Sequence, residues 1–386
     1  MGRRVTATVT CGGSCVGVVG PFPVDVPWWA ETEPVVAHLE RTLGVPVVVL
    51  RLLGVDGGGG ARDGHARYHV EALERPESVR PCDFVVDDHP LRLAWARASG
   101  IRELFEWAAL HVDAQGPPRQ RKTWNLSGLF RLPTADGPVW LKAIPPFAAA
   151  EPVAIRAIAA VDPALVPTVL ASAPGRLLLT DVPGEDCWDA SAQTVAEVLA
   201  RWVGVQARLA EPLPGVPDRR PPALRAAVDN LLDGPVGAEL SPAEIDAARA
   251  LGDRWEVLAD CGLPDTLVHG DFHPGNWRRG DGAPVVLDLA DAHLGNPVLD
   301  GLRAIDFLPE GRRRGAADAW IAAWSAAAPG SRPAAALRIA EPLAQLAYAV
   351  RYQEFLDNIE PSERIYHRGD PAAAIRAAVA SAAGGG

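Results

Sequence analysis

The chain has 386 residues, of which 48% are hydrophobic and 22% charged, and this ordinary globular composition excludes wholesale disorder. A formal net charge of −11 argues against a nucleic-acid-binding surface, and no apolar run approaches the ~20 residues that a membrane-spanning helix needs. The five cysteines are scattered, unlike the dense spacing of a disulfide scaffold. We therefore expect a soluble, cytoplasmic protein of two or three domains that binds neither nucleic acid nor a membrane.

Residues 1–115 are expected to form a small α/β domain whose role the sequence does not indicate. Its predicted strands are Val5–Thr10, Val16–Val19, Val45–Leu53 and Arg67–Ala72, and its predicted helices are Thr32–Leu43 and Asp88–Leu110. Gly44 closes the first helix, and Gly100 is expected to interrupt the second. Two prolines indicate a linker at Gly116–Arg121.

Two further regions follow, residues 116–183 and residues 184–386. The first is predicted to hold strands at Leu126–Leu132, Pro138–Ile144 and Leu177–Leu179 around a helix at Pro152–Ala160. The second is mostly helical, with apolar residues at helical spacing in Ala192–Leu209 and again in Ile245–Leu258. A strand–loop–strand insert, Thr266–Leu289, interrupts these helices and holds most of the residues suited to chemistry.

Lysine is rare in this chain. Of the 37 basic residues only Lys122 and Lys142 are lysines, so arginine serves wherever a positive charge suffices. Lys142 lies in an apolar predicted strand, between Leu141 and Ala143. Because an ammonium is a compact point charge suited to phosphate, we favour a functional role for Lys142 over an ordinary surface lysine.

The insert carries an aspartate, an asparagine and a second aspartate at informative spacing. Asp271 lies in the loop after a short strand, Asn276 follows five residues later, and Asp288 ends the next strand. Phosphoryl transfer needs a carboxylate near the acceptor hydroxyl and oxygen ligands for Mg²⁺ on the phosphates. This layout is typical of a kinase catalytic loop followed by its metal loop.

With these residues in place, the chain from Thr123 to Ala383 resembles the aminoglycoside phosphotransferase family, whose members have a protein-kinase-like fold. The matching segments are Leu267–Trp277, Val286–Asp300 and Leu177–Gly184, together with Lys142. The resemblance implies an α+β protein: a β-rich small lobe at 116–183 and a helical large lobe at 184–386, after the N-terminal domain. That domain faintly resembles a degenerate Nudix fold around Ala37–Val45.

The resemblance also implies a role for individual residues. Asp271 is expected as the catalytic base, and Asn276 and Asp288 as Mg²⁺ ligands. The small lobe is expected to bind the nucleotide through Lys142 on the phosphates, Glu151 as its carboxylate partner, and a hinge formed by Thr180, Asp181 and Val182. The expected nucleotide loop, Asn125–Gly137, lacks the glycine motif of protein kinases and offers Ser127. Asp300 is expected to steady the catalytic loop.

The predicted function is transfer of the γ-phosphate of ATP or GTP to a hydroxyl of an antibiotic or metabolite. A catalytically silent nucleotide-binding regulator on the same fold is an alternative, although such proteins usually lose the lysine, the base or the metal aspartate. A metal-dependent hydrolase built on His269, Asp271 and His273 is a weaker one. Glu354, Asp357 and Glu360 fit a solvated acidic face better than a site for a cationic substrate.

Overall fold

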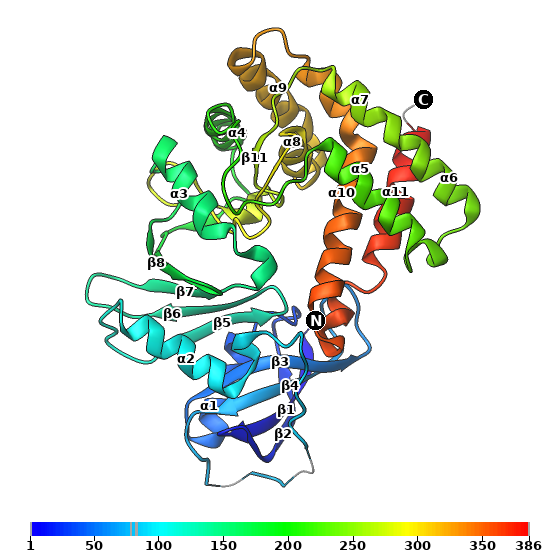
Figure 1. Ribbon diagram of the computed structural model, residues 1–386. Helices are drawn as coiled ribbons and strands as arrows, with labels where there is room; N and C mark the ends of the chain where they lie inside the picture. Colours follow the sequence, from blue (N-terminus) through cyan, green and yellow to red (C-terminus); the bar gives the residue numbers. More distant parts are fainter. Residues whose placement is uncertain (1, 78, 82–83, 385–386) are drawn as a thin grey trace. The chain divides into compact units, whose positions relative to one another are not determined.

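The structure is a computed structural model that describes residues 2–77, 79–81 and 84–384 (Figure 1). Its contacts divide the chain into two compact units. The first unit holds the described residues up to Phe147, with Leu170–Asp181 and Phe355–Arg368. The second unit holds Ala148–Val169, Val182–Glu354 and the residues from Gly369 onward. The three-domain division expected from the sequence stays a prediction.

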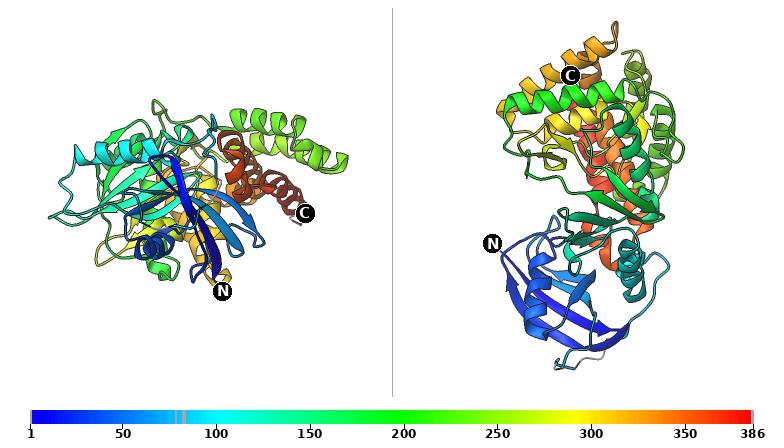
Figure 2. Two further views of the ribbon diagram at one scale, coloured as in Figure 1. Left: turned by 90° about the horizontal axis from the view of Figure 1, so that it is seen from below. Right: turned by 90° about the vertical axis from the view of Figure 1, so that its left-hand side faces the viewer.

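A four-stranded sheet begins the first unit, in the order β2-β1-β4-β3. Its elements are β1 (Arg3–Cys11), β2 (Ser14–Val24), α1 (Glu33–Leu43), β3 (Val47–Asp56) and β4 (His65–Ala72). Alternate residues of β1 are fully buried, and α1 covers that face of the sheet (Figures 1 and 2). Gly44 ends α1 with φ 71°, the left-handed conformation that glycine adopts most readily. The predicted strands and first helix of this region are confirmed.

A second, five-stranded sheet of the same unit runs in the order β5-β6-β7-β9-β8. Its strands are β5 (Arg119–Trp124), β6 (Ser127–Leu132), β7 (Val139–Ala143), β8 (Val169–Ala173) and β9 (Arg176–Thr180). The helix α2 (Ala98–Ala109) packs its buried residues against the apolar side chains of β6 and β7. Gln120 ties this sheet to β3, because its side chain both accepts from Val49 N (2.8 Å) and donates to Val49 O (2.7 Å).

Two sequence expectations about this unit are wrong. The linker expected at Gly116–Arg121 contains the start of β5, since tertiary pairing with β6 outweighs the two prolines before it. The helix expected at Asp88–Leu110 begins only at Ala98, after a short 3₁₀ turn, η1 (Ala94–Ala96). Gly100 does not interrupt the helix: a Cβ there would lie 2.0 Å from Ala94 O, so glycine permits a close backbone approach.

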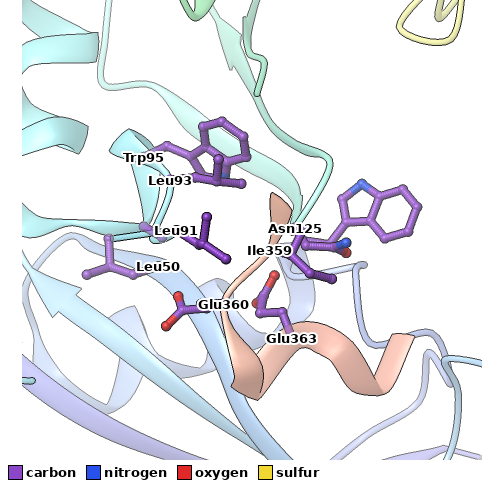
Figure 3. Close-up of a pocket in the computed structure, with 10 residues that line it drawn as sticks. Leu50, Leu91, Leu93, Trp95, Asn125, Ile359, Glu360 and Glu363 are labelled. Atoms are coloured by element: carbon purple, nitrogen blue, oxygen red, sulfur yellow. The ribbon is translucent and has the colours of Figure 1, made fainter. Parts of the chain in front are cut away.

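A C-terminal segment, residues 355–368, belongs to the first unit and is held there by carboxylates. Glu363 Oε1 accepts a hydrogen bond from Leu52 N (2.7 Å), and Glu360 forms ion pairs with Arg51 (3.0 Å) and Arg92 (2.9 Å). Both glutamates are buried and line a small pocket with leucine and tryptophan side chains (Figure 3). The expectation that Glu360 belongs to a solvated acidic face is therefore wrong: arginines buried with it match its charge.

The second unit is mostly helical. Its helices are α3 (Glu151–Val161), α4 (Ala192–Gln206), α5 (Pro221–Asp233), α6 (Pro242–Ala250), α7 (Arg254–Ala259), α8 (Val298–Asp306), α9 (Glu310–Ala327) and α11 (Asp370–Gly384), and α10 (Pro333–Asn358) continues into the first unit. The helix expected across Ile245–Leu258 is two helices, α6 and α7, with a 3₁₀ turn between them. None of the helices in the described residues is both long enough and apolar enough to cross a membrane.

Short strands in this unit carry the strand–loop–strand insert. They are β10 (Glu185–Asp186), β11 (Thr266–Val268), β12 (Trp277–Arg279), β13 (Val285–Val286) and β14 (His293–Gly295). β11 pairs with β14, and β12 pairs with β10 and β13. The loop from β11 to β12 and the residues just after β13 hold Asp271, Asn276 and Asp288.

Candidate active site

Strand pairing brings Asn276 and Asp288 to the same end of a hairpin. Trp277 pairs with Val286 across the β12–β13 ladder, and Leu287 N donates to Asn276 O at 2.8 Å. Asp288 directly follows Leu287. Asn276 and Asp288, twelve residues apart in the sequence, therefore lie at neighbouring positions of the backbone. Asp288 has φ +61°, a left-handed conformation that costs a non-glycine residue roughly 1–3 kcal/mol and that clusters at functional sites.

The residues at this hairpin end suit a hard cation. The Asn276 amide nitrogen donates to Asp271 O (2.9 Å) and Asp271 Oδ2 (3.2 Å), which leaves the amide oxygen as the Asn276 ligand atom. Asp288 adds a carboxylate on an exposed residue. The described residues contain no cluster of three or more His, Cys, Asp or Glu arranged for a metal. One amide oxygen and one carboxylate are the kind of protein ligands that suit Mg²⁺, which usually keeps waters and takes phosphate oxygens as its other ligands.

Asp271 lies at the centre of a hydrogen-bonded group. Its Oδ1 accepts from Arg303 Nε (2.9 Å) and Nη2 (2.7 Å), and its Oδ2 lies 3.3 Å from His273 Nε2. Burial alone would raise the pKa of Asp271, but the His273 hydrogen bond and the Arg303 charge hold that pKa well below its usual range. The side chain is still 30% exposed. The carboxylate is thus ionised and accessible, as a general base must be.

Arg303 was not expected from the sequence. It lies on α8, three residues after Asp300, and its guanidinium stacks between the rings of Phe307 (4.1 Å) and Tyr348 (4.9 Å). Although burial acts to lower it, the pKa of Arg303 is raised by the charge of Asp271, so the pair is ionised on both sides. The one available signal was its helical spacing from Asp300, because residues three apart share a helix face.

Asp300 fixes the backbone of the loop that carries Asp271. Its Oδ2 accepts from His269 N (2.8 Å), Trp202 Nε1 (2.9 Å) and Gln206 Nε2 (3.0 Å), and its Oδ1 accepts from Gly270 N (3.0 Å). Burial raises the pKa of Asp300, and these N–H donors act against that rise. These hydrogen bonds to His269 and Gly270 are the contacts that the expected steadying role of Asp300 requires.

The two loop histidines are engaged within the protein. His269 Nδ1 accepts from Asp271 N (3.2 Å), so His269 Nε2 carries the proton and donates to Leu287 O (2.9 Å). His273 Nδ1 accepts from Gly275 N (3.0 Å), and its Nε2 faces Asp271. Neither imidazole of the pair presents an unused nitrogen to a metal, which argues against the hydrolase alternative built on His269, Asp271 and His273.

Glu354 is partly exposed, with 32% of its side chain accessible, and it is paired with two arginines. It accepts from Arg351 Nη1 (2.6 Å) and pairs with Arg219, while Arg351 Nε donates to Asp291 Oδ1 (2.8 Å). Asp291 follows Asp288 in the same loop, so this network anchors α10 to the segment after the metal-loop aspartate. Asp357, by contrast, is exposed.

The residues expected to bind nucleotide divide between the two units. Lys142 lies on β7, paired with Leu129 of β6 and Leu177 of β9, and is 6% exposed. Ser127 begins β6, where its Oγ accepts from Trp124 Nε1 (3.3 Å). Glu151 is buried at the first turn of α3, in the second unit.

The expected hinge falls where the first unit ends and the second resumes, between Asp181 and Val182. Thr180 ends β9, and Asp181 Oδ1 accepts from Trp140 Nε1 (2.6 Å). Val182 O accepts from Arg278 Nε (2.7 Å), which holds it to β12.

The strand β6 occupies the middle of the expected loop at Asn125–Gly137. The β5–β6 turn is only two residues long, since Trp124 pairs with Ser127. Asn125 at this turn is 1% exposed and lines the pocket of Figure 3. Alternating burial of Gly128, Phe130 and Leu132 explains why the following residues form β6 instead of a flexible loop.

Comparisons with known proteins identify solved structures of similar fold. The chain resembles the choline kinase LicA from Streptococcus pneumoniae (12% identity, TM-score 0.56, 73% of this chain and 100% of that one). It also resembles a choline/ethanolamine kinase family protein from Mesorhizobium loti (15%, 0.52, 72% and 98%) and APH(2")-IIia in a GDP and kanamycin complex (11%, 0.51, 74% and 98%). At these identities the likeness shows a shared fold. No curated protein matches the sequence.

The expected α+β, protein-kinase-like phosphotransferase fold is thereby confirmed. A family model described as the phosphotransferase enzyme family matches residues 130–337, which begin after the four-stranded sheet and include Lys142, Asp271, Asn276 and Asp288. Because that match spans more than half of the 386 residues, the chain belongs to the phosphotransferase enzyme family.

Proposed function

We propose that this protein transfers the γ-phosphate of ATP or GTP to a hydroxyl of a small molecule, an antibiotic or a metabolite. The observation that carries the proposal is the state of Asp271. It is a carboxylate that Arg303 and His273 keep ionised, it is partly exposed, and it is bonded to Asn276. Family membership makes the chain a phosphotransferase; the donor, the acceptor and the residue roles below belong to the proposal.

Asp271 orients the acceptor hydroxyl and takes up its proton during transfer. Oδ1 accepts two short hydrogen bonds from Arg303, at 2.9 and 2.7 Å, whereas the contacts of Oδ2 with Asn276 (3.2 Å) and His273 (3.3 Å) are longer. Oδ2 is therefore the oxygen that can more easily accept from a hydroxyl. Fixing the carboxylate before the substrate arrives removes the entropic cost of orienting it in the transition state. Asp300 contributes indirectly, by holding the backbone of His269 and Gly270.

The Asn276 amide oxygen and the Asp288 carboxylate would hold Mg²⁺, which supplies charge neutralisation to the phosphates when bound. Lys142 would contact the α- and β-phosphates, with Glu151 as its partner and Ser127 at the nearby turn. The backbone of Thr180, Asp181 and Val182 would bind the nucleotide base.

A nucleoside diphosphate release screen tests the proposal. The wild-type protein with Mg²⁺ and either ATP or GTP would be incubated with hydroxylated antibiotics and primary metabolites, and Asp271→Asn would serve as the blank. We expect at least one acceptor to stimulate release in the wild type and not in the blank. Equal release by both proteins with every acceptor would contradict the assignment of Asp271.

A further inference from the structure

Three aromatic rings gather beside Asp271, and two of them are exposed. Trp188 and Phe307 are each 39% exposed, and their ring centroids lie 6.2 Å apart. The His273 ring packs nearly parallel to both, at 5.3 Å and 21° from Trp188 and at 4.8 Å and 16° from Phe307. Large apolar side chains exposed together, and not singly, usually mark a surface that binds something.

The rings are linked directly to the candidate base. His273 Nε2 lies 3.3 Å from Asp271 Oδ2, the carboxylate oxygen that Arg303 leaves unused. The Arg303 guanidinium lies 4.1 Å from the Phe307 ring centroid while donating to Asp271 Oδ1. A molecule whose hydroxyl reaches Asp271 therefore has Trp188 and Phe307 beside it.

Trp188 is held against the loop that carries Asp271 by the contacts of its neighbours. Cys187 N donates to Pro274 O at 2.9 Å, which fastens the residue before Trp188 to the catalytic loop. A Cβ on Gly275 would lie 2.5 Å from the Trp188 ring, so the loop has room for that ring only because residue 275 is glycine. Asp271, Gly275 and Trp188 thus form one fixed surface.

We propose that Trp188 and Phe307 form the acceptor platform, and that the acceptor carries its reactive hydroxyl on, or directly beside, a ring. A sugar ring or a polycyclic body can lay a flat C–H or π face against both side chains, whereas a short linear alcohol cannot. Because the Arg303 guanidinium already lies against the Phe307 ring, its charge would repel a positively charged group of the acceptor at that ring. This inference rests on the proposed function and names the substrate class for its site.

The test compares acceptors and variants in one assay of nucleoside diphosphate release. The acceptors are the best ring-bearing compound from the screen above and glycerol as a linear probe. The variants are Trp188→Ala, Phe307→Ala and Trp188→Phe, with Val257→Ala as the control, an exposed apolar residue on α7 of the same unit. KM for the acceptor and KM for the nucleotide are measured separately.

We expect each alanine variant to raise the KM of the ring-bearing acceptor by about tenfold, as loss of one aromatic stacking contact does, with a much smaller change in the nucleotide KM. Trp188→Phe should restore most of the loss, and Val257→Ala should behave as wild type. Unchanged acceptor KM in both alanine variants, a rise only in the nucleotide KM, or a preference for glycerol would overturn the platform. Absence of acceptor-stimulated release in the wild type would instead refute the proposed function itself.

Discussion

Two carboxyl groups of this protein, Asp271 and Glu363, have opposite protonation states. Asp271, on the loop after β11, has Arg303 and His273 bonded to it, and its pKa lies well below the usual range. Glu363, in the C-terminal segment, is bonded to the Leu52 N–H, and burial raises its pKa to about 8. The first is ionised and 30% exposed, whereas the second is protonated at neutral pH and 4% exposed.

The difference in protonation state fits two different roles, a proposed catalytic role for Asp271 and a structural role for Glu363. A carboxylate that must accept a proton needs a partner that keeps it charged and a path to the acceptor. A carboxyl group that only accepts a backbone hydrogen bond costs less free energy to bury as the neutral acid than as the anion. The buried charge beside Glu363 is carried by Glu360, which Arg51 and Arg92 neutralise. Substitutions in each of the two regions test this difference.

Removing the second metal-loop oxygen should have the largest effect. Asp288→Asn keeps the shape of the side chain and removes its charge, so Mg²⁺ would lose its only anionic protein ligand at the hairpin end. Because metal stabilisation of transition-state charge amounts to several kcal/mol, kcat should fall by about 10³-fold or more. Steady-state kinetics over a range of Mg²⁺ concentrations measures this. A kcat within tenfold of wild type would contradict the metal assignment.

Arg303→Met should lower turnover less, and should change its pH dependence. Without the guanidinium the pKa of Asp271 rises toward the ordinary value, so the carboxylate becomes protonated at a higher pH. The acidic limb of the kcat/KM profile should therefore move to higher pH, and kcat at neutral pH should fall by up to about 100-fold through misplacement of the base. A proportional loss at every pH, with no shift of the limb, would show that Arg303 is not a charge partner of the base.

Glu360→Ala should destabilise the first unit. It removes the buried carboxylate that Arg51 and Arg92 share and leaves these buried guanidinium groups paired with the exposed Asp87. Breaking a buried ion pair in this way costs about 3–5 kcal/mol. Urea denaturation measures the loss. The matched control is Asp218→Asn, which breaks an exposed pair with Arg220 and should cost at most about 1 kcal/mol. Equal losses for the two variants would contradict the buried network.

Glu363→Gln should stabilise the first unit, by an amount that grows as the pH rises above about 4.3. With a pKa of about 8 when folded and about 4.3 when unfolded, Glu363 binds more protons in the folded state between those values. Its contribution to stability is therefore complete below pH 4.3 and is lost as the pH rises to 8. The glutamine variant should differ least from wild type at about pH 4 and should exceed its free energy of unfolding increasingly up to about pH 8. A constant difference would show that Glu363 does not titrate on unfolding.

The sequence predicted the residues whose spacing is dictated by local geometry. Asp271, Asn276 and Asp288 could be proposed together because a short loop and hairpin bring them to one place, and α4 because its apolar residues repeat at helical spacing. It did not predict contacts between distant segments. Glu360 pairs with Arg92 across 268 positions and Glu363 bonds to Leu52 across 311, so their burial has no local signature.

The same reason explains why the acceptor platform was missed. Trp188 precedes α4 and Phe307 follows α8, and each by itself resembles an ordinary apolar residue at the end of an element. Their meeting at His273 depends on the fold of the second unit. The strand β5 was likewise missed because its pairing with β6, and not its composition, determines its conformation.

We infer that Asp271 acts in phosphoryl transfer and not in binding the nucleotide. The most direct test of this inference is to measure Mg²⁺·nucleotide affinity by calorimetry and acceptor-dependent turnover, on the wild type and on Asp271→Asn. We expect the two proteins to bind Mg²⁺·nucleotide with affinities within about threefold of each other, and the variant to turn over about 10²–10⁴-fold more slowly. Turnover near that of the wild type, or a loss explained wholly by failure to bind nucleotide, would contradict it.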